Sequence, residues 1–355
     1  MKMQLRESLR ADCADLLSAT RVAALEPLRN SAMLVTGGTG FVGSWIAELV
    51  AHLNDAHNFG TRLLLLARGT DAYRKLRPHI AERRDVELLK GDVRNTFEIP
   101  RDIQWIVHAA ATPDTRTHTM HPVDTMTTIA QGTETILRAA ERLSGLRMLL
   151  NVSSGLVYGP QALDIERISE DCMVGPPLNT QGSAYAEAKR YAETLCASFR
   201  NQARLPVAVV RPFAFMGPYQ SLTGPWAAST FLADAIANRK IRVLGDGETV
   251  RSYMYGSDLG YWMLRVLAGA EPGAVYNIGN PEPVTLRNLA LLVAAQCENA
   301  QEIQFSVGTG AALQRSRLVP NVTRAVHAFD LATTVSLEAA VRKTMVWHRL
   351  AQEVQ

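Results

Sequence analysis

Tyr185 and Lys189 have the types and the spacing for proton transfer. They stand four residues apart in SAYAEAKRYAE, and four residues bring two side chains to the same face of a helix. A free phenol has a pKa of about 10, which is too high for an efficient base at neutral pH. A neighbouring ammonium and a positively charged nicotinamide favour the phenolate, so we expect Lys189 to lower the pKa of Tyr185. The pair could then move a proton to or from a carbinol oxygen while hydride moves to or from a cofactor.

A third group lies in NVSSGLVYG, residues 151–159, where an apolar run ends in two adjacent hydroxyls. Ser153 and Ser154 precede Tyr185 by about 30 residues along the chain. A hydroxyl at the end of a strand could hydrogen-bond the oxygen that gains or loses the proton. From the residues alone, the stretch is either an ordinary strand-end turn or half of an active site.

A cofactor site is indicated early in the chain by LVTGGTGFVGSW. Gly38, Gly40 and Gly43 fit the pattern G-x-G-x-x-G, and Gly37 adds an overlapping G-x-x-G-x-x-G reading. Glycines permit a tight turn between strand and helix and let the backbone approach a pyrophosphate, while the helix N-terminus attracts the anion. We therefore expect a dinucleotide at this turn, bound through Gly37, Gly40, Phe41, Val42 and Gly43.

The ends of the following strands predict the other cofactor contacts. The second strand ends in LLLLARGT, where an NAD-preferring site usually has an acidic residue for the ribose 2′-hydroxyl. Here Ala67 is followed by Arg68, and a small residue beside a guanidinium suits a 2′-phosphate. We therefore expect an NAD(P) cofactor and favour NADP over NAD. The third and fourth strands end in further expected contacts, which are Asp92, Val93, Ala109 and Ala110.

A parallel sheet would bring these strand ends together. Short, continuously apolar runs alternate with helical patterns, at residues 32–36, 62–67, 86–90, 104–110, 146–154 and 205–213. Such runs are typical of strands buried on both faces, and the alternation favours right-handed crossovers. The sequence predicts an α/β fold, a Rossmann-type doubly wound parallel sheet with a smaller C-terminal α/β substrate lobe.

The patterning divides the chain into three parts. Residues 1–30 have apolar side chains at roughly helical spacing and predict a helical N-terminal extension. Residues 31–213 carry the predicted dinucleotide-binding sheet. Pro and Gly become frequent from residue 214, so we expect 214–355 to form mainly the substrate-binding lobe. Within that part, 275–279 is a candidate to return to the main sheet.

Composition narrows the class of protein. Charged residues are 20% of the chain and the net charge is +3 without a clustered basic face, so no nucleic-acid partner is expected. No run approaches the ~18 apolar residues of a membrane span, and no membrane partner is expected. The four cysteines lie far apart, and free thiols fit a reducing cytoplasm, which is the expected location.

Two histidine pairs raise the question of a metal site. His52 and His57 are five residues apart, and His118 and His121 are three apart. No carboxylate cluster accompanies either pair at the spacing of metal ligands. We therefore interpret these side chains as loop histidines and expect no metal.

Over about residues 31–300 the chain resembles the extended short-chain dehydrogenase/reductase family, in its NAD(P)-dependent nucleotide-sugar epimerase/dehydratase group. The resemblance rests on the order and spacing of TGGTGFVG, GDV, HAAA, VSSGLVYG, YAEAK, RPFAFMGP, DGETVRSYMYGSDL and YNIG. It implies that Ser154, rather than Ser153, hydrogen-bonds the reacting oxygen. It further implies Tyr185 as the acid/base, and Lys189 as the residue that lowers its pKa and holds the nicotinamide ribose.

The resemblance also bears on substrate and assembly. Arg251 matches the arginine that binds the diphosphate of a nucleotide-sugar substrate, and a guanidinium is well suited to phosphate. Members often form homodimers by pairing two long helices of each subunit. Here the candidate helices are 124–143 and 184–199, and a homodimer is expected.

Four residues depart from the family pattern. Gly155 and Leu156 stand where 4,6-dehydratases have an acidic pair, and where sugar-acid decarboxylases often keep a glutamate. Ala214 and Ile129 stand where asparagine is frequent, so two polar contacts to the substrate are missing. Without an acid after Ser154, hydride transfer at sugar C4 ranks above elimination. The leading hypothesis is a 4-epimerase or a 4-keto-sugar reductase.

Three alternatives stay open. A 4,6-dehydratase could take its acid from elsewhere, such as Glu187 or Asp114. A reductase of a non-sugar carbonyl would have no need of Arg251. A non-catalytic dinucleotide sensor would have no need of the Tyr185–Lys189 pair.

Overall fold

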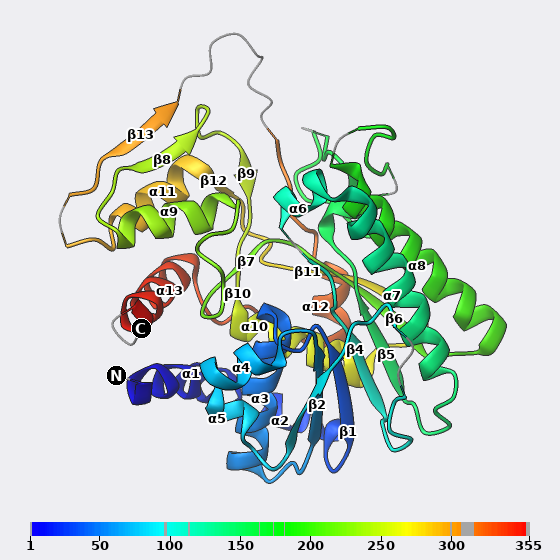
Figure 1. The fold of residues 1–355 in the computed structure, drawn as a ribbon. Helices are drawn as coiled ribbons and strands as arrows, with labels where there is room; N and C mark the ends of the chain where they lie inside the picture. Colours follow the sequence, from blue (N-terminus) through cyan, green and yellow to red (C-terminus); the bar gives the residue numbers. More distant parts are fainter. Residues whose placement is uncertain are drawn as a thin grey trace.

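The computed structural model describes residues 2–95, 98–112, 114–162, 164–172, 174–180, 182–298, 300–306 and 316–352. Its centre is a sheet of seven parallel strands in the order β11-β6-β5-β4-β1-β2-β3 (Figure 1). The strands are β1 (Ala32–Thr36), β2 (Arg62–Ala67), β3 (Val86–Lys90), β4 (Trp105–His108), β5 (Met148–Val152), β6 (Val207–Pro212) and β11 (Val275–Ile278). The prediction of a doubly wound parallel sheet is confirmed. Strand order reverses between β1 and β4, which is where ligands bind in open α/β sheets.

β1 shows why the sequences of the strands are continuous apolar runs. All five of its residues are buried, because helices cover both faces of the sheet. Met33 and Val35 belong to the core beneath one helical layer, whereas Leu34, on the opposite face, belongs to the core beneath the other. A strand of this kind has no solvated side, so polar and apolar residues do not alternate.

Two helical layers enclose the sheet (Figure 1). One contains α3 (Phe41–His57), α10 (Gly256–Gly269) and α12 (Thr323–Phe329), and the other contains α7 (Pro122–Ala140) and α8 (Ser183–Ala203), which pack against each other. Shorter helices follow β2 and β4, namely α4 (Thr70–Leu76), α5 (Pro78–Ala81) and α6 (Thr115–Met120). Segments after residue 213 thus supply α10, β11 and α12 to the main sheet and its cover.

The rest of the C-terminal part forms a smaller lobe beside the sheet (Figure 1). Its helices are α9 (Ala227–Ile236), α11 (Leu286–Ala294) and α13 (Leu337–Gln352), which share an apolar core. Its short strands pair as β8 (Ile241–Leu244) with β13 (Ile303–Ser306), β7 (Phe215–Met216) with β10 (Met254–Tyr255), and β9 (Val250–Arg251) with β12 (Val284–Thr285).

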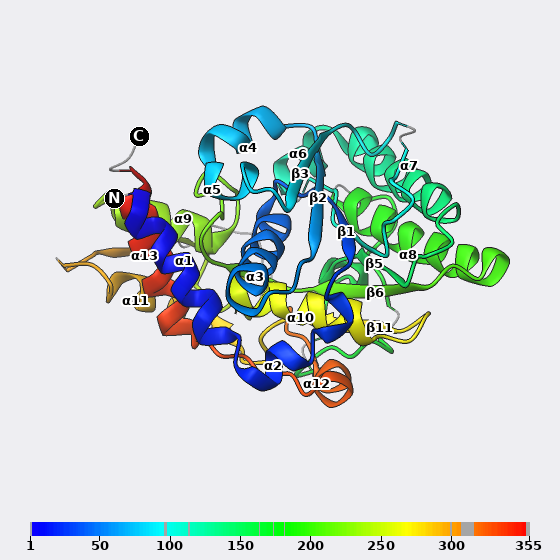
Figure 2. The same ribbon diagram turned by 90° about the horizontal axis from the view of Figure 1, so that it is seen from below.

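The N-terminal extension folds as α1 (Lys2–Leu16), α2 (Ala19–Ala23) and the short 3-10 helix η1 (Glu26–Leu28). α1 packs on α3 and lies beside α13 (Figure 2). The buried Asp12 accepts a hydrogen bond from the Tyr255 hydroxyl at 2.6 Å and also bonds the Lys343 ammonium of α13. The extension therefore joins the sheet layer to the smaller lobe. In the described part of the chain, every helix is too short or too polar to cross a bilayer.

Candidate active site

Ser154, Tyr185 and Lys189 meet at the carboxyl end of β5. Ser154 directly precedes the 3-10 helix η2 (Gly155–Tyr158), and its hydroxyl accepts a hydrogen bond from the Leu156 amide at 3.2 Å. Tyr185 lies in the first turn of α8 and shares a side-chain hydrogen bond with Ser154. Both side chains are buried. The structure thus brings together the three residues on which the sequence hypothesis depends.

Lys189 is held by the backbone of the same strand. Its ammonium donates a hydrogen bond to the Val152 carbonyl at 2.7 Å and lies 5.8 Å from the centre of the Tyr185 ring. Burial lowers the pKa of Lys189 to about 8, against the opposing charge of Glu193. The ammonium is therefore fixed in position and has a pKa close to the working range of a neutral-pH enzyme.

The phenol differs from the sequence expectation. Burial raises the pKa of Tyr185 to about 12, and the hydrogen bond with Ser154 only partly opposes that rise. Ile129, on the neighbouring α7, packs against the ring in a small apolar cluster. Lys189 does not offset this desolvation in the protein chain itself. Ile129 is therefore one of the side chains that bury the phenol.

Ser153 and Ser154, adjacent in sequence, have different partners. The Ser153 hydroxyl donates to Glu193 on α8, and Arg211 of β6 binds the same carboxylate at 2.6 Å. Arg211 also donates to the Tyr158 hydroxyl at 2.8 Å. Ser153 therefore belongs to a buried ionic network beneath the site, and Ser154 is the hydroxyl left for a ligand. Sequence reasoning missed this network, although Glu193 stands eight residues after Tyr185 on one face of α8.

The glycine turn has the shape of a cofactor cradle. Gly37 has a φ of +68°, and a Cβ there would lie 2.8 Å from the carbonyl oxygen of Ala109. Gly40 precedes α3, whose first-turn amides come from Phe41, Val42 and Gly43 and have no partner within the helix. These amides and the close backbone fit the pyrophosphate of a dinucleotide.

The remaining predicted cofactor residues lie at the same edge of the sheet. Ala109 and Ala110 follow β4 and bond Thr36 of β1 through their amides, at 3.2 and 3.3 Å. Asp92, after β3, binds Arg94 at 2.7 Å, and this bond lowers its pKa to about 2. Val93 is buried.

Arg68 is exposed at the end of β2. Its charge contributes to lowering the pKa of Asp92, and it forms no hydrogen bond or ion pair with any residue that the structure describes. The guanidinium is therefore available to an anionic ligand.

Arg251 lies on β9 in the smaller lobe, half-buried. Its guanidinium donates to the carbonyl and hydroxyl oxygens of Ser316, at 3.2 and 3.0 Å, and to its own neighbour Val250 at 2.8 Å. Within the described ranges no carboxylate forms an ion pair with it, and burial lowers its pKa. A half-buried cation without a carboxylate partner in the described ranges favours binding of an anion.

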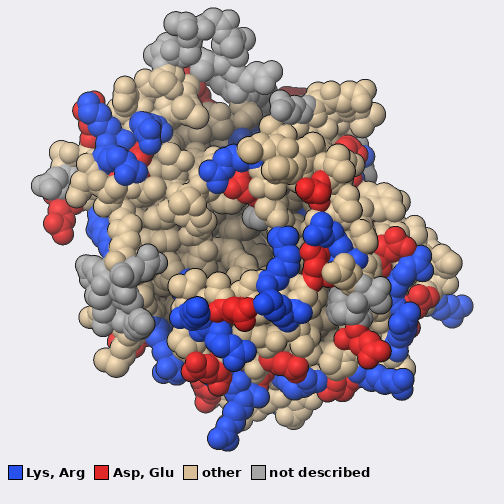
Figure 3. Space-filling view, in the orientation of Figure 1, with Lys and Arg blue, Asp and Glu red and all other residues tan. Residues whose placement is uncertain are grey.

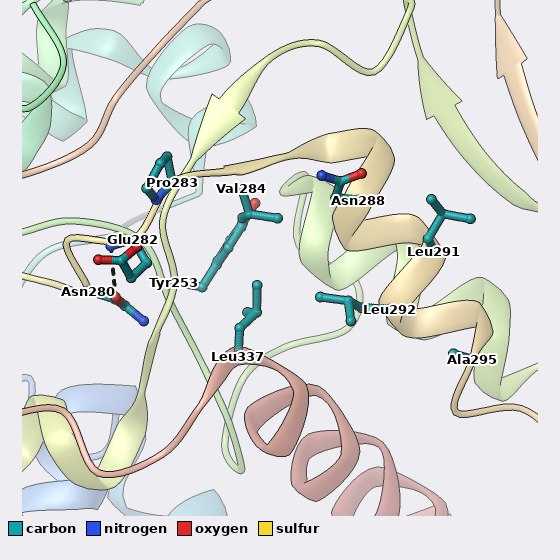
Figure 4. A pocket seen from close by; sticks show the side chains of 10 residues that line it. All are labelled: Tyr253, Asn280, Glu282, Pro283, Val284, Asn288, Leu291, Leu292, Ala295 and Leu337. Carbon is teal, nitrogen blue, oxygen red and sulfur yellow. Dashed lines mark hydrogen bonds between the residues drawn. The ribbon is translucent and has the colours of Figure 1, made fainter.

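The face between the two lobes is hollowed, and Lys and Arg side chains border the hollow (Figure 3). A separate pocket of about 500 Å³ lies within the smaller lobe, between β12, α11 and the start of α13 (Figure 4). Its lining is mainly apolar and includes Tyr253, Val284 and Leu337. Its lining contains none of the predicted site residues: the predicted catalytic and cofactor residues lie at the sheet edge, and Arg251 lies on β9.

The loop assignment is wrong for His52, His57 and His118. His52 and His57 lie in α3. His118 lies in α6, because the Asp114 carboxylate accepts a hydrogen bond from the Arg116 amide and begins a helix there. His121 follows α6 and is exposed. His118 is instead buried and stacks on Tyr185. Among the residues with described positions, no cluster of three His, Cys, Asp or Glu could hold a metal ion.

Known proteins are similar to this chain in sequence. Residues 33–279 match the model of the NAD dependent epimerase/dehydratase family. UDP-glucuronic acid decarboxylase 1 of Xenopus tropicalis is 27% identical over 328 residues, which cover 91% of this chain and 73% of that protein. UDP-glucuronic acid decarboxylase 6 of Arabidopsis thaliana is 30% identical over 290 residues, covering 80% of this chain and 81% of that protein.

Solved structures share the fold. A variant of UDP-glucuronic acid 4-epimerase from Bacillus cereus, in complex with NAD and UDP-4-deoxy-4-fluoro-glucuronic acid, has a TM-score of 0.76. It is 20% identical, and the match covers 91% of this chain and 99% of the other. At this identity the likeness concerns the arrangement of the elements.

Proposed function

Because this chain belongs to the NAD-dependent epimerase/dehydratase family, we propose that it transfers hydride at C4 of a nucleoside-diphosphate sugar. The observation that carries the proposal is the meeting of Ser154, Tyr185 and Lys189 beside Leu156, a side chain without a proton to give. A bound nicotinamide dinucleotide supplies the hydride acceptor or donor. Ser154 hydrogen-bonds the C4 oxygen and Tyr185 takes or gives its proton. Lys189 holds the cofactor ribose and favours the phenolate.

Leu156 separates this proposal from decarboxylation and dehydration. It is 42% exposed within η2, two residues after Ser154, and its side chain is apolar. The resemblance implies an acidic pair at this position in 4,6-dehydratases and, often, a glutamate in sugar-acid decarboxylases. A leucine there cannot remove or deliver a proton at C5 or C6, which supports chemistry confined to one carbon.

Asp114 and Glu187 are the two acids that could replace the missing one. Both are poorly suited to the proton transfers of a 4,6-dehydratase. Asp114 is bound to Arg116 at 2.6 Å, and this bond lowers its pKa to about 2, so it is ionised at neutral pH. Glu187 lies 3.7 Å from the guanidinium of Arg190 and is directed to that charge. Neither arrangement supports a 4,6-dehydratase.

A 4-epimerase and a 4-keto-sugar reductase remain as two outcomes of the same chemistry. Mass spectrometry of ligands released from freshly purified protein distinguishes them. Tightly held NAD favours an epimerase, which returns the hydride to the same sugar. A site that is purified empty and binds NADPH favours a reductase. Protein that binds neither dinucleotide would contradict the proposal.

Replacing Arg251 by Ala is expected to raise the KM for UDP-glucuronic acid or UDP-glucose by about tenfold or more, because charge-assisted hydrogen bonds to phosphate are lost. Steady-state kinetics measure the effect. Arg242→Ala is the matched control, since that guanidinium is exposed and already binds Asp234 at 3.2 Å. An unchanged KM in Arg251→Ala would favour a substrate without a nucleotide.

We also infer a preference for NADP over NAD, which rests on Arg68. Its exposed guanidinium and the small Ala67 before it suit a 2′-phosphate. Arg68→Ala should weaken NADPH binding by about tenfold and NADH binding much less, as measured by calorimetric Kd values. Equal losses for the two cofactors would refute this preference.

We also propose that two copies of the chain form a homodimer through α7 and α8. These helices pack on each other and expose Val123, Met126 and Tyr191 to solvent. A second copy pairing the same helices would bury these apolar side chains in a four-helix bundle. Sedimentation equilibrium is expected to give twice the chain mass of 38.9 kDa, and the mass of one chain would contradict a dimer.

A further inference from the structure

The ring of His118 lies flat against the ring of Tyr185. Their centroids are 4.2 Å apart and the two planes differ by 11°. His118 is only 3% exposed, although it belongs to the six-residue helix α6 at the rim of the sheet. This stack brings a titratable side chain to the proposed acid/base, and the proposed reaction gives that side chain no role.

The imidazole is fixed from its other side. Its Nε2 atom lies 2.6 Å from the carbonyl oxygen of Thr112. A carbonyl only accepts hydrogen bonds, so Nε2 carries the hydrogen and Nδ1 is the bare nitrogen of the neutral ring. Burial lowers the pKa of His118, opposed by the hydrogen bond to Thr112 and by the charge of Asp114, while the charge of Lys189 acts with the burial. The ring that stacks on Tyr185 is therefore anchored by its bond to Thr112.

The other side chains around the Tyr185 ring are not flat. Ser154 bonds the hydroxyl, and the apolar cluster around the ring consists of Ile129, Ala188, Ala192 and Ala111. A planar partner in face contact resists rotation of the phenol about its Cα–Cβ and Cβ–Cγ bonds, since rotation breaks the stack. His118 is the described residue placed to provide that restraint.

We propose that His118 is a positioning residue for Tyr185, which holds the phenol in the plane that directs its hydroxyl to Ser154 and the reacting oxygen. The inference rests on the proposed function, in which Tyr185 is the acid/base. His118 exchanges no proton with the substrate in this role. Because proton transfer depends on alignment, loss of the restraint lowers turnover and leaves binding intact.

Three variants separate stacking from the other properties of His118. His118→Ala removes both the ring and its hydrogen bond, whereas His118→Phe keeps a flat ring and removes only the hydrogen bond. His121→Ala is the control, because His121 stands three residues on and is exposed. Each variant is assayed on whichever of UDP-glucose and UDP-glucuronic acid the native protein converts faster.

His118→Ala is expected to lower kcat by about tenfold, with KM and the Kd of NAD changed by less than about twofold. His118→Phe should recover most of the lost kcat, and His121→Ala should match the native protein. A second readout needs no substrate. In ultraviolet difference titration against Tyr185→Phe, the tyrosinate signal of Tyr185 should appear at lower pH in His118→Ala, because water reaches the ring, and not in His118→Phe.

Native kcat and an unchanged titration in His118→Ala would overturn the inference, since His118 would then be a packing residue. Equal losses in His118→Ala and His118→Phe would also overturn it, because the hydrogen bond to Thr112 and not the stack would matter. Failure of the proposed function is distinguished by Tyr185→Phe. If that variant keeps its turnover, Tyr185 is not the acid/base, whatever the His118 variants do.

Discussion

Tyr185→Phe is expected to lower kcat by about 10²- to 10⁴-fold while the Kd of NAD stays within about twofold. The substitution removes the hydroxyl that takes or gives the proton and keeps the ring. The stack with His118 and the contact with Ile129 are therefore retained. Loss of the hydrogen bond to Ser154 should reduce the free energy of unfolding by only about 1 kcal/mol. Steady-state kinetics and calorimetric titration with NAD measure the two quantities.

Tyr191→Phe provides the control for this prediction. Tyr191 is on the same helix and is 51% exposed, away from Ser154, so the same change should leave kcat as it is. Native turnover in Tyr185→Phe would remove Tyr185 from the mechanism. A large loss of NAD affinity would instead show that the hydroxyl serves the cofactor site.

Glu193→Gln is expected to lower the free energy of unfolding by about 3–5 kcal/mol. The carboxylate binds Arg211 at 2.6 Å, and the side chains are 14% and 6% exposed. Glutamine has nearly the same shape but leaves the guanidinium of Arg211 buried without a counter-charge. It also replaces the acceptor of the Ser153 hydroxyl next to the catalytic turn. Urea denaturation followed by circular dichroism measures the change.

The same substitution should alter the pH dependence of turnover. Burial lowers the pKa of Lys189 to about 8, and the negative charge of Glu193 opposes that shift. Removing the charge should lower this pKa further, so the limb of the kcat profile due to Lys189 moves to lower pH. Glu187→Gln is the control on the same helix, because its pair with Arg190 is longer and more exposed, and it should cost less than about 1 kcal/mol. Equal effects of the two substitutions would contradict a structural role for the Glu193 network.

Local patterns in the sequence were sufficient for the sheet and the cofactor turn. A strand that is buried on both faces has a continuously apolar sequence, as β1 does. β1 is followed directly by the glycines that its turn requires. The turn geometry depends on residues that are neighbours in the chain, as with Gly37 and Gly40. Four-residue spacing likewise placed Tyr185 and Lys189 on one face of α8, since helix geometry fixes that relation.

Properties that depend on packing between distant elements could not be predicted in this way. Burial raises the pKa of Tyr185, against the hydrogen bond with Ser154, and that burial comes from side chains on other elements such as Ile129 of α7. The partner of His118 is on another helix, so no local pattern distinguishes a stacked histidine from a loop histidine. Local residue types did not distinguish Ser153 from Ser154. The family resemblance favoured Ser154, and the bond of Ser153 to Glu193 depends on the position of α8.

The most direct test of hydride transfer confined to C4 is turnover of UDP-glucose and UDP-glucuronic acid in deuterium oxide. Mass spectrometry and nuclear magnetic resonance of the products then locate any deuterium bound to carbon. We expect products without carbon-bound deuterium and without loss of water or carbon dioxide, because Leu156 cannot exchange protons with C5 or C6. Stable deuterium at C5 or C6, or a product that has lost water or carbon dioxide, would contradict it.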